Sequence, residues 1–261
     1  MDRSAICLNN PHIALPCIYR VSWRQPLAWL GLGWGDFKRN FMLSSSLGVV
    51  FGVFGYAVVH HFLKESHLAM ALTSGFLLVA PFLAIGFYGM SCQIEEGKAH
   101  VEEDRAFACI RDNAASIGLF GLMYALVLSA WERFSAILVA LMLRGDWVSS
   151  GPFSFNALWA VEHWQFVAAY VGFGALLASL VFAASVVSLP MMMDRKADVV
   201  TAVVTSLVVV RQNLAPMALW AAIIVVLSAI GVATQFIGMI LIFPLLGHAS
   251  WHAYRDLVQA E

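Results

Sequence analysis

Long apolar runs, separated by short polar links, occupy most of this chain. Hydrophobic residues make up 61% of it and charged residues 12%, against ~25% charged residues in an average soluble domain. A helix needs ~20 apolar residues to cross a bilayer. Six runs come near that length, at about residues 41–62, 68–92, 114–131, 166–190, 217–233 and 236–254. The sequence therefore predicts an all-α polytopic membrane protein with six transmembrane helices.

The first 25 residues differ from the rest of the chain. They are polar and irregular, contain Pro11 and Pro16, and lack the apolar core of a cleaved signal peptide. We expect residues 1–25 to form a cytoplasmic tail and residues 26–258 to form a single membrane domain.

Two apolar stretches are too short to span. Residues 199–210 are mostly apolar. A polar stripe at helical spacing runs along them and their neighbours, made by Asp198, Thr201, Thr205 and Gln212. Residues 26–37 are rich in tryptophan, which favours the headgroup level of the membrane. Both stretches are typical of helices that lie in the interface. We expect short cytoplasmic interfacial helices before the first and fifth spans.

The basic residues assign the two sides of the membrane. With six spans, one set of loops holds 12 Lys and Arg residues and the other set holds three, Lys64, Arg133 and Arg144. Positive residues stay on the cytoplasmic side. The N and C termini are therefore expected in the cytoplasm.

A basic residue and an asparagine precede each odd-numbered span. The asparagine is suited to cap the free backbone amides of the next helix. Pro81 and Pro244 also occupy similar places in the second and sixth spans. We infer three tandem helical hairpins; the alternative is that any helix leaving the cytoplasm tends to follow a cation and a cap. The three motifs are Lys38-Arg39-Asn40, Arg111-Asp112-Asn113 and Arg211-Gln212-Asn213.

The third span runs into a second apolar stretch. One helix over residues 114–143 would be ~45 Å long at 1.5 Å per residue, longer than the hydrocarbon core. Because an ion pair inside the membrane is costly, we place Glu132 and Arg133 at the outer interface. The sequence leaves open whether this is one long helix or a span followed by an interfacial helix.

Two histidines near the end of the chain share a helix face. His248 and His252 have the i, i+4 spacing that can bind a metal or haem, and Asp256 lies one turn further on to orient His252. The competing interpretation is an interfacial cluster in which Arg255 stacks on Trp251. No cofactor is predicted; haem or copper is the alternative.

Two further groups could bind metals. On the outer side four histidines and two carboxylates would suit zinc or copper if the loops met. Met191, Met192 and Met193 could bind Cu(I), although such methionines more often fill irregular packing. The outer residues are His60, His61, His67 and His163 with Glu65 and Glu162.

Charged and polar residues are also expected to meet at the cytoplasmic ends of the helices. Pairing of Asp194, Arg195 and Asp198 with Arg255 and Asp256 would join two hairpins, and exchanging Asp194 with Arg255 should then restore the stability lost in either single mutant. The full candidate cluster is Asp194, Arg195, Asp198, Arg211, Asn213, Arg255 and Asp256.

Several function classes are disfavoured. There is no Ser-His-Asp arrangement, phosphate-binding loop or mid-span carboxylate, so we expect neither an enzyme nor an ion-coupled pump. The net charge of −1 gives no sign of nucleic-acid binding. The cysteines Cys7, Cys17, Cys92 and Cys109 fall on the predicted cytoplasmic side, where disulfides are unexpected.

Several segments resemble the uncharacterised bacterial integral-membrane family DUF2189. They are residues 185–220 (SVVSLPMMMDRKADVVTAVVTSLVVVRQNLAPMALW), residues 243–258 (FPLLGHASWHAYRDLV), WLGLGWGDFKRN and FLLVAPFLAIGFYGMS. The resemblance implies a six-helix protein of the bacterial inner membrane with no assigned activity. The leading functional hypothesis is an accessory, assembly or scaffold component that contacts lipid and another membrane protein or itself. The alternatives are a small-solute transporter or channel and a haem- or copper-handling protein of the respiratory chain.

Overall fold

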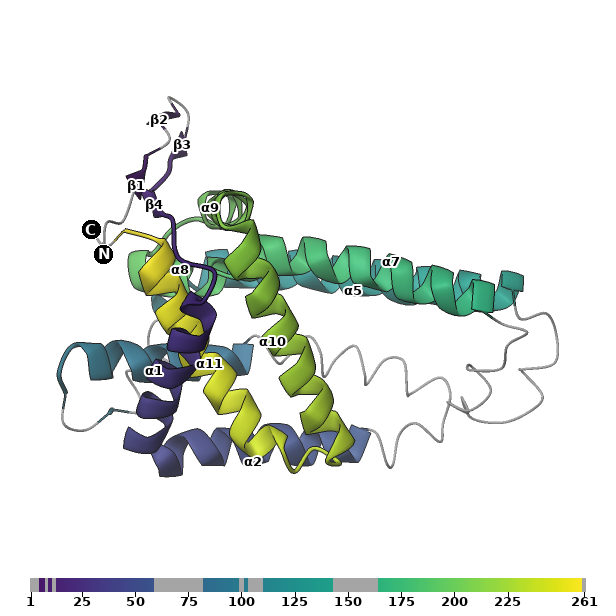
Figure 1. The fold of residues 1–261 in the computed structure, drawn as a ribbon, viewed down its shortest axis with the longest axis horizontal. Coiled ribbons are helices and arrows are strands. Elements are labelled where there is room, and N and C mark those ends of the chain that lie inside the picture. Colours follow the sequence, from purple (N-terminus) through teal and green to yellow (C-terminus); the bar gives the residue numbers. More distant parts are fainter. Residues whose placement is uncertain are drawn as a thin grey trace.

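The computed structural model describes residues 5–7, 9–10, 13–58, 82–98, 101–102, 110–142 and 164–259, and most of them are helical (Figure 1). The all-α prediction is thereby confirmed. The helices are α1 (Gln25–Arg39), α2 (Phe41–Ala57), a segment at 82–95, α5 (Ala114–Met142), α7 (Trp164–Ser185), α8 (Ser188–Arg195), α9 (Val199–Gln212), α10 (Leu214–Ala233) and α11 (Met239–Leu257).

The helices α1 and α11 lie side by side and make the most extensive helix-to-helix contact among the described residues (Figure 1). Gly33 of α1 makes this approach possible, because a Cβ there would lie 2.6 Å from the backbone nitrogen of Ala249 on α11. Trp29, Trp251 and Tyr254 are buried around the contact. Large aromatic side chains of this kind bury ~150–250 Å² each, so they contribute strongly to this contact.

The chain bends by 104° between α1 and α2, at Asn40. Gly48 and Gly52 of α2 then face the backbone carbonyls of Ile240 and Phe236. A Gly-xxx-Gly spacing lets two helices approach closely. Here the neighbour is the start of α11 in the same chain.

Three helix-to-helix joints share one design. Asn40, Asn113 and Asn213 are each the single non-helical residue between two helical stretches. Asn40 and Asn213 have nearly the same backbone angles, with φ −118° and ψ 44° against φ −128° and ψ 43°. Each asparagine carbonyl accepts the first backbone hydrogen bond of the next helix. The repeated motif of the sequence is thus a repeated local structure.

The capping role predicted for these asparagines is wrong at Asn40 and Asn213. Neither side chain hydrogen-bonds to the amides of the helix that follows. At Asn213 the side-chain oxygen and nitrogen are both occupied by bonds to other backbone groups. The joint is therefore formed by backbone geometry, and the side chain is available for a different contact.

Among the described residues, three helices are long and apolar enough to cross a membrane: Ala114–Leu138, Trp164–Arg195 and Leu214–Ala233. A fourth span is obtained if the bent pair α1 and α2 counts as one. The helix α5 runs without a break from Ala114 to Met142, so Glu132 and Arg133 lie within one continuous helix. Most of the second predicted span, at 68–81, lies outside the described residues.

The turn before the last helix is longer than the two residues expected. It occupies residues 234–238, and α11 begins at Met239 rather than at 236. Gln235 and Phe236 adopt positive φ angles of 56° and 65°, which ends the helical path and starts the return.

The N-terminal segment forms a small antiparallel hairpin. Strands β1 (Ala5–Ile6) and β4 (Ile18–Tyr19) pair, as do β2 (Asn9–Asn10) and β3 (Ile13–Ala14). The hairpin brings Cys7 and Cys17 opposite each other, with 4.2 Å between their Cα atoms, and they form a disulfide. The expectation that these cysteines stay unpaired is therefore wrong.

Candidate functional site

A row of polar side chains crosses the buried contact between α1, α2, the segment 82–95 and α11. His248 of α11 has no exposed surface. Its Nε2 lies 2.9 Å from the Ser44 hydroxyl and its Nδ1 lies 2.8 Å from the Ser91 hydroxyl. Both imidazole nitrogens are thus occupied, and a metal or haem iron could bind His248 only after one of these bonds broke.

The second histidine is held by a residue that sequence reasoning missed. Nε2 of His252 lies 2.8 Å from Oδ2 of Asp36, a buried carboxylate on α1. The Ser91 hydroxyl is also in hydrogen-bonding reach of this carboxylate. Asp256, the partner expected for His252, instead accepts hydrogen bonds from Gln25 and Trp29.

These contacts define one consistent direction of donation. A carboxylate only accepts, so Ser91 donates to Asp36 and accepts from Nδ1–H of His248. The unprotonated Nε2 of His248 then accepts from Ser44. Every member of the row has a partner, which is the condition under which a buried polar network stabilises a fold. Among the described residues, no three His, Cys, Asp or Glu side chains are placed to hold a metal ion.

A second polar group lies where α8 meets α11. Asp194 pairs with Arg255 at 3.3 Å, as the sequence analysis expected, and Arg255 also pairs with Glu95 at 3.0 Å. The Tyr254 hydroxyl donates to Asp194 at 2.6 Å and accepts from Arg195. We call Glu95, Asp194, Arg195, Tyr254 and Arg255 the α8–α11 cluster; it holds two acids and two bases and is neutral overall.

The acidic neighbours of Arg255 keep its guanidinium group protonated. Burial alone lowers its pKa, but the hydrogen bond and charge of Glu95 and the charge of Asp194 outweigh this effect and raise the pKa. The guanidinium also lies 6.0 Å from the centre of the Trp251 ring, which agrees with the stacking predicted from the sequence.

Other residues of the predicted cluster are found elsewhere. Asp198 caps α9 by accepting from the amides of Val200 and Thr201. Arg211 is exposed. Asn213 binds the N-terminal segment: its Oδ1 accepts from the Val21 amide at 3.0 Å, and its Nδ2 donates to the Tyr19 carbonyl at 3.1 Å.

Asn113 has a similar connecting role. Its Nδ2 donates to the carbonyls of Met192 and Ala197, which flank the end of α8. An asparagine at a joint thus holds a neighbouring segment in two of the three cases. The motif identified the right residues, because an amide side chain offers both donors and an acceptor at a place where the backbone turns.

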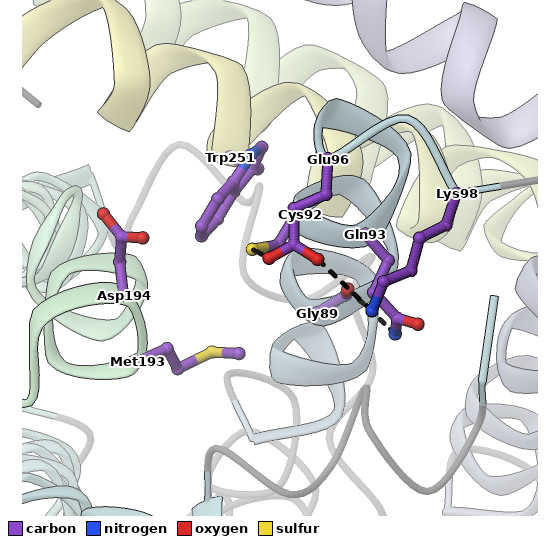
Figure 2. A pocket seen from close by; sticks show the side chains of 8 residues that line it. All are labelled: Gly89, Cys92, Gln93, Glu96, Lys98, Met193, Asp194 and Trp251. Atoms are coloured by element: carbon purple, nitrogen blue, oxygen red, sulfur yellow. Dashed lines mark hydrogen bonds and ion pairs between the residues drawn. The ribbon is translucent and has the colours of Figure 1, made fainter.

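A pocket of about 260 Å³ opens beside the α8–α11 cluster (Figure 2). Met193 and Asp194 of α8 form one wall, the segment from Gly89 to Lys98 forms the other, and Trp251 closes it. Met191, Met192 and Met193 are all buried, in agreement with the packing interpretation. Its lining residues are Gly89, Cys92, Gln93, Glu96, Lys98, Met193, Asp194 and Trp251.

The outer-side metal prediction cannot be placed on this structure. His60, His61, His67 and His163 lie outside the described residues, as do Glu65 and Glu162. Sequence reasoning also missed Asp36, Ser44, Ser91 and Tyr254, which carry the central contacts. The local signal was the presence of Asp36 in the otherwise apolar stretch 26–37, since an unneeded charge there would be costly.

The comparisons with known proteins agree with the membrane assignment. No curated protein and no solved structure matches the chain. The family match includes FLLVAPFLAIGFYGMS and ends at Asp194, so it covers only the first ten residues of segment 185–220 and neither WLGLGWGDFKRN nor segment 243–258. The resemblance to DUF2189 is confirmed: residues 69–194 match its family model, described as a predicted integral membrane protein.

Proposed function

We propose that the protein is a non-catalytic accessory component of a membrane complex and that α5 contacts its partner. The observation that carries this proposal is Glu132. One of its carboxylate oxygens, Oε1, is sealed from solvent and has no hydrogen-bond partner in the part of the chain that the structure describes. A buried acceptor without a donor costs on the order of several kcal/mol in an apolar medium. Because Oε1 is covered by this chain, it meets a donor on a neighbouring protein only after the Glu132 side chain turns outward, and that contact would remove the cost.

The helices around Glu132 leave room for a neighbour. α5 and α7 lie side by side and extend away from α1 and α11 (Figure 1). They pack through Trp131, Phe134, Tyr170 and Phe173. In an apolar stretch of 18 residues taken from each helix, only 11% of the residues are buried in Ala114–Leu138 and 6% in Trp164–Arg195, against 22% in Leu214–Ala233. The described residues leave the remaining apolar surface of these helices open to lipid or to another helix.

Site-specific photocrosslinking tests this role. Ser129 and Ala136 lie one turn before and one turn after Glu132 on the same face and are exposed. A crosslinking amino acid at either position should yield one discrete protein adduct in native membranes, and Glu132→Leu should abolish it. The same probe at exposed Val225 on α10 is the matched control. An equal adduct at Val225, or an adduct that survives Glu132→Leu, would refute the proposed contact.

We further infer six spans in three hairpins in the bacterial inner membrane, with both termini in the cytoplasm. The 12-to-3 distribution of basic residues and the repeated asparagine joints support this topology. The Cys7–Cys17 disulfide argues for the opposite side, since cytosolic thiols are kept reduced. A reporter after Glu261 that is active only in the periplasm would overturn the topology. Thiol trapping in intact cells would show whether the disulfide forms there.

A further inference from the structure

The pocket of Figure 2 has open acceptors on one side. Asp194 uses a single carboxylate oxygen, Oδ2, for its contacts with Tyr254, Arg195 and Arg255. Its other oxygen, Oδ1, takes no hydrogen bond from the described residues. A carboxylate has about four lone-pair sites, so Asp194 can still accept from a ligand.

Glu96 adds a second acceptor near the same space. Its Oε2 lies 3.2 Å from the ammonium of Lys98, while its Oε1 has, among the described residues, only the weak thiol donor of Cys92, at 4.0 Å. The Glu96 side chain is 53% exposed and can turn toward solvent. An ion pair with one exposed partner contributes little, so a ligand can displace Glu96.

Lys98 lines the pocket with donors that are only partly used. Its Nζ is hidden from solvent, and although it lies within ion-pair distance of Glu96 it makes no hydrogen bond with the described residues. An ammonium carries three donors. Figure 2 shows Lys98 and Asp194 on opposite sides of the pocket, with Glu96 on the Lys98 side. Once a ligand displaces Glu96, the pocket offers the Lys98 donors at one end and the Asp194 acceptor at the other.

We propose that this pocket binds a small zwitterion, whose ammonium group meets Asp194 and whose phosphate or carboxylate displaces Glu96 from Lys98. Its volume of about 260 Å³ lies below the ~300–1,000 Å³ of sites for drug-sized ligands, which restricts the ligand to a small molecule or a lipid headgroup. The sulfur-containing side chains of Cys92 and Met193 line its walls.

Two sources share this chemistry. The ligand is either the phosphoethanolamine headgroup of a lipid or a soluble compound such as an amino acid. Both present an ammonium and an acidic oxygen group a few bonds apart. The proposal goes beyond the accessory role of α5 and does not depend on it, because the pocket and Glu132 lie on different elements.

Protection of Cys92 from alkylation tests the proposal directly, because its thiol lines the pocket. The purified protein in detergent is treated with N-ethylmaleimide, and the modification of Cys92 is followed by peptide mass spectrometry. O-phosphoethanolamine or glycine should slow the reaction at least threefold in a saturable manner. Ethanolamine alone, inorganic phosphate alone and sodium chloride at equal ionic strength should have a much smaller effect.

Single substitutions test the acidic end of the ligand. Lys98→Gln should weaken the protection at least fivefold, whereas Glu96→Gln removes the carboxylate that competes for Lys98 and should not weaken it. Lys196→Gln and Asp112→Asn are the matched controls, because this pair lies 3.2 Å apart on the exposed surface outside the pocket. Nanodiscs then separate the sources: protection by phosphatidylethanolamine but not by the soluble compounds identifies the headgroup, and the reverse identifies a soluble ligand. No protection by either, or protection unchanged in Lys98→Gln, would overturn the proposal.

Discussion

Nε2 of His252 lies 2.8 Å from Oδ2 of Asp36, and this contact joins the last helix of the described chain to the first. The two residues are 216 positions apart in sequence. Both are largely buried, so the contact closes the interface between α1 and α11 from within.

Removing one partner of this contact should destabilise the protein. Asp36→Asn or His252→Gln leaves the other group buried without its charge-assisted bond, which typically costs about 3 kcal/mol. Thermal unfolding in detergent should show a clear drop in Tm for both variants and a double mutant that is less than additive. The control Asp112→Asn, on the exposed surface, should change Tm little. Fully additive effects would mean that the two residues do not act as a pair.

The Ser44 hydroxyl is expected to contribute far more to the stability of the protein than the Ser46 hydroxyl. Ser44→Ala leaves Nε2 of buried His248 without a donor, at a cost of about 1–3 kcal/mol. Ser46→Ala is the matched control on the same helix, because Ser46 is exposed and bonds only to the Leu43 carbonyl. Chemical denaturation of both variants should separate them. Equal stability would argue against the Ser44–His248 bond.

Asp198 should give α9 a pH-dependent contribution to stability. Hydrogen bonds from Thr201 and Val200 lower its pKa below the usual value. A lowered carboxyl pKa stabilises the folded state above the unfolded pKa, near 4, and this stabilisation is lost as the pH falls through the lowered value. Asp198→Ala should cost about 1 kcal/mol at pH 7. Asp198→Asn should keep most of the cap and remove its pH dependence below pH 4, as followed by helix content.

Exchanging Asp194 with Arg255 should fail to restore stability, contrary to the expectation from the sequence alone. In the exchanged protein the new arginine would lie beside Arg195 and the new aspartate beside Glu95. Like charges at these distances repel, so the double exchange should be no more stable than the single variants. The exposed Lys196–Asp112 pair should tolerate the same exchange. Recovery of Tm in the exchanged protein would show that the α8–α11 cluster is a simple pair.

Docking of the N-terminal segment should survive loss of the disulfide. The contacts use backbone groups: the Gln259 amide donates to the Cys17 carbonyl, and the Val21 amide donates to Asn213. In Cys17→Ser, hydrogen exchange should stay slow at Gln259 and Val21. Asn213→Ala should speed exchange at Val21. Fast exchange at Gln259 in Cys17→Ser would show that the disulfide holds the segment in place.

The sequence predicted those features that depend on residues close together in the chain. The short helix expected at 199–210 is found as α9, Val199–Gln212, because the polar stripe has helical spacing and Asp198 is a good cap. The separate helix α1, before α2, followed from tryptophan content and a proline in its first turn. The asparagine joints followed from a three-residue motif.

The partners of the buried polar residues could not be predicted in this way. His248 and Ser44 are 204 positions apart, and nothing in either neighbourhood shows which hydroxyl meets which imidazole. The i, i+4 spacing correctly placed His248 and His252 near one face. It did not show that Ser44, Ser91 and Asp36 already occupy both rings, because that depends on how α1, α2 and the segment 82–95 pack on α11.

The attachment of the N-terminal segment to Asn213, Val258 and Gln259 affects the order of assembly. Val21 leaves the ribosome 192 residues before the amide that binds it. The hairpin and α1 must therefore wait, without their final partners, while the later helices are made and inserted. Contacts of such long range close late and slowly. The core between α1 and α11 is thus among the last parts of this protein to form.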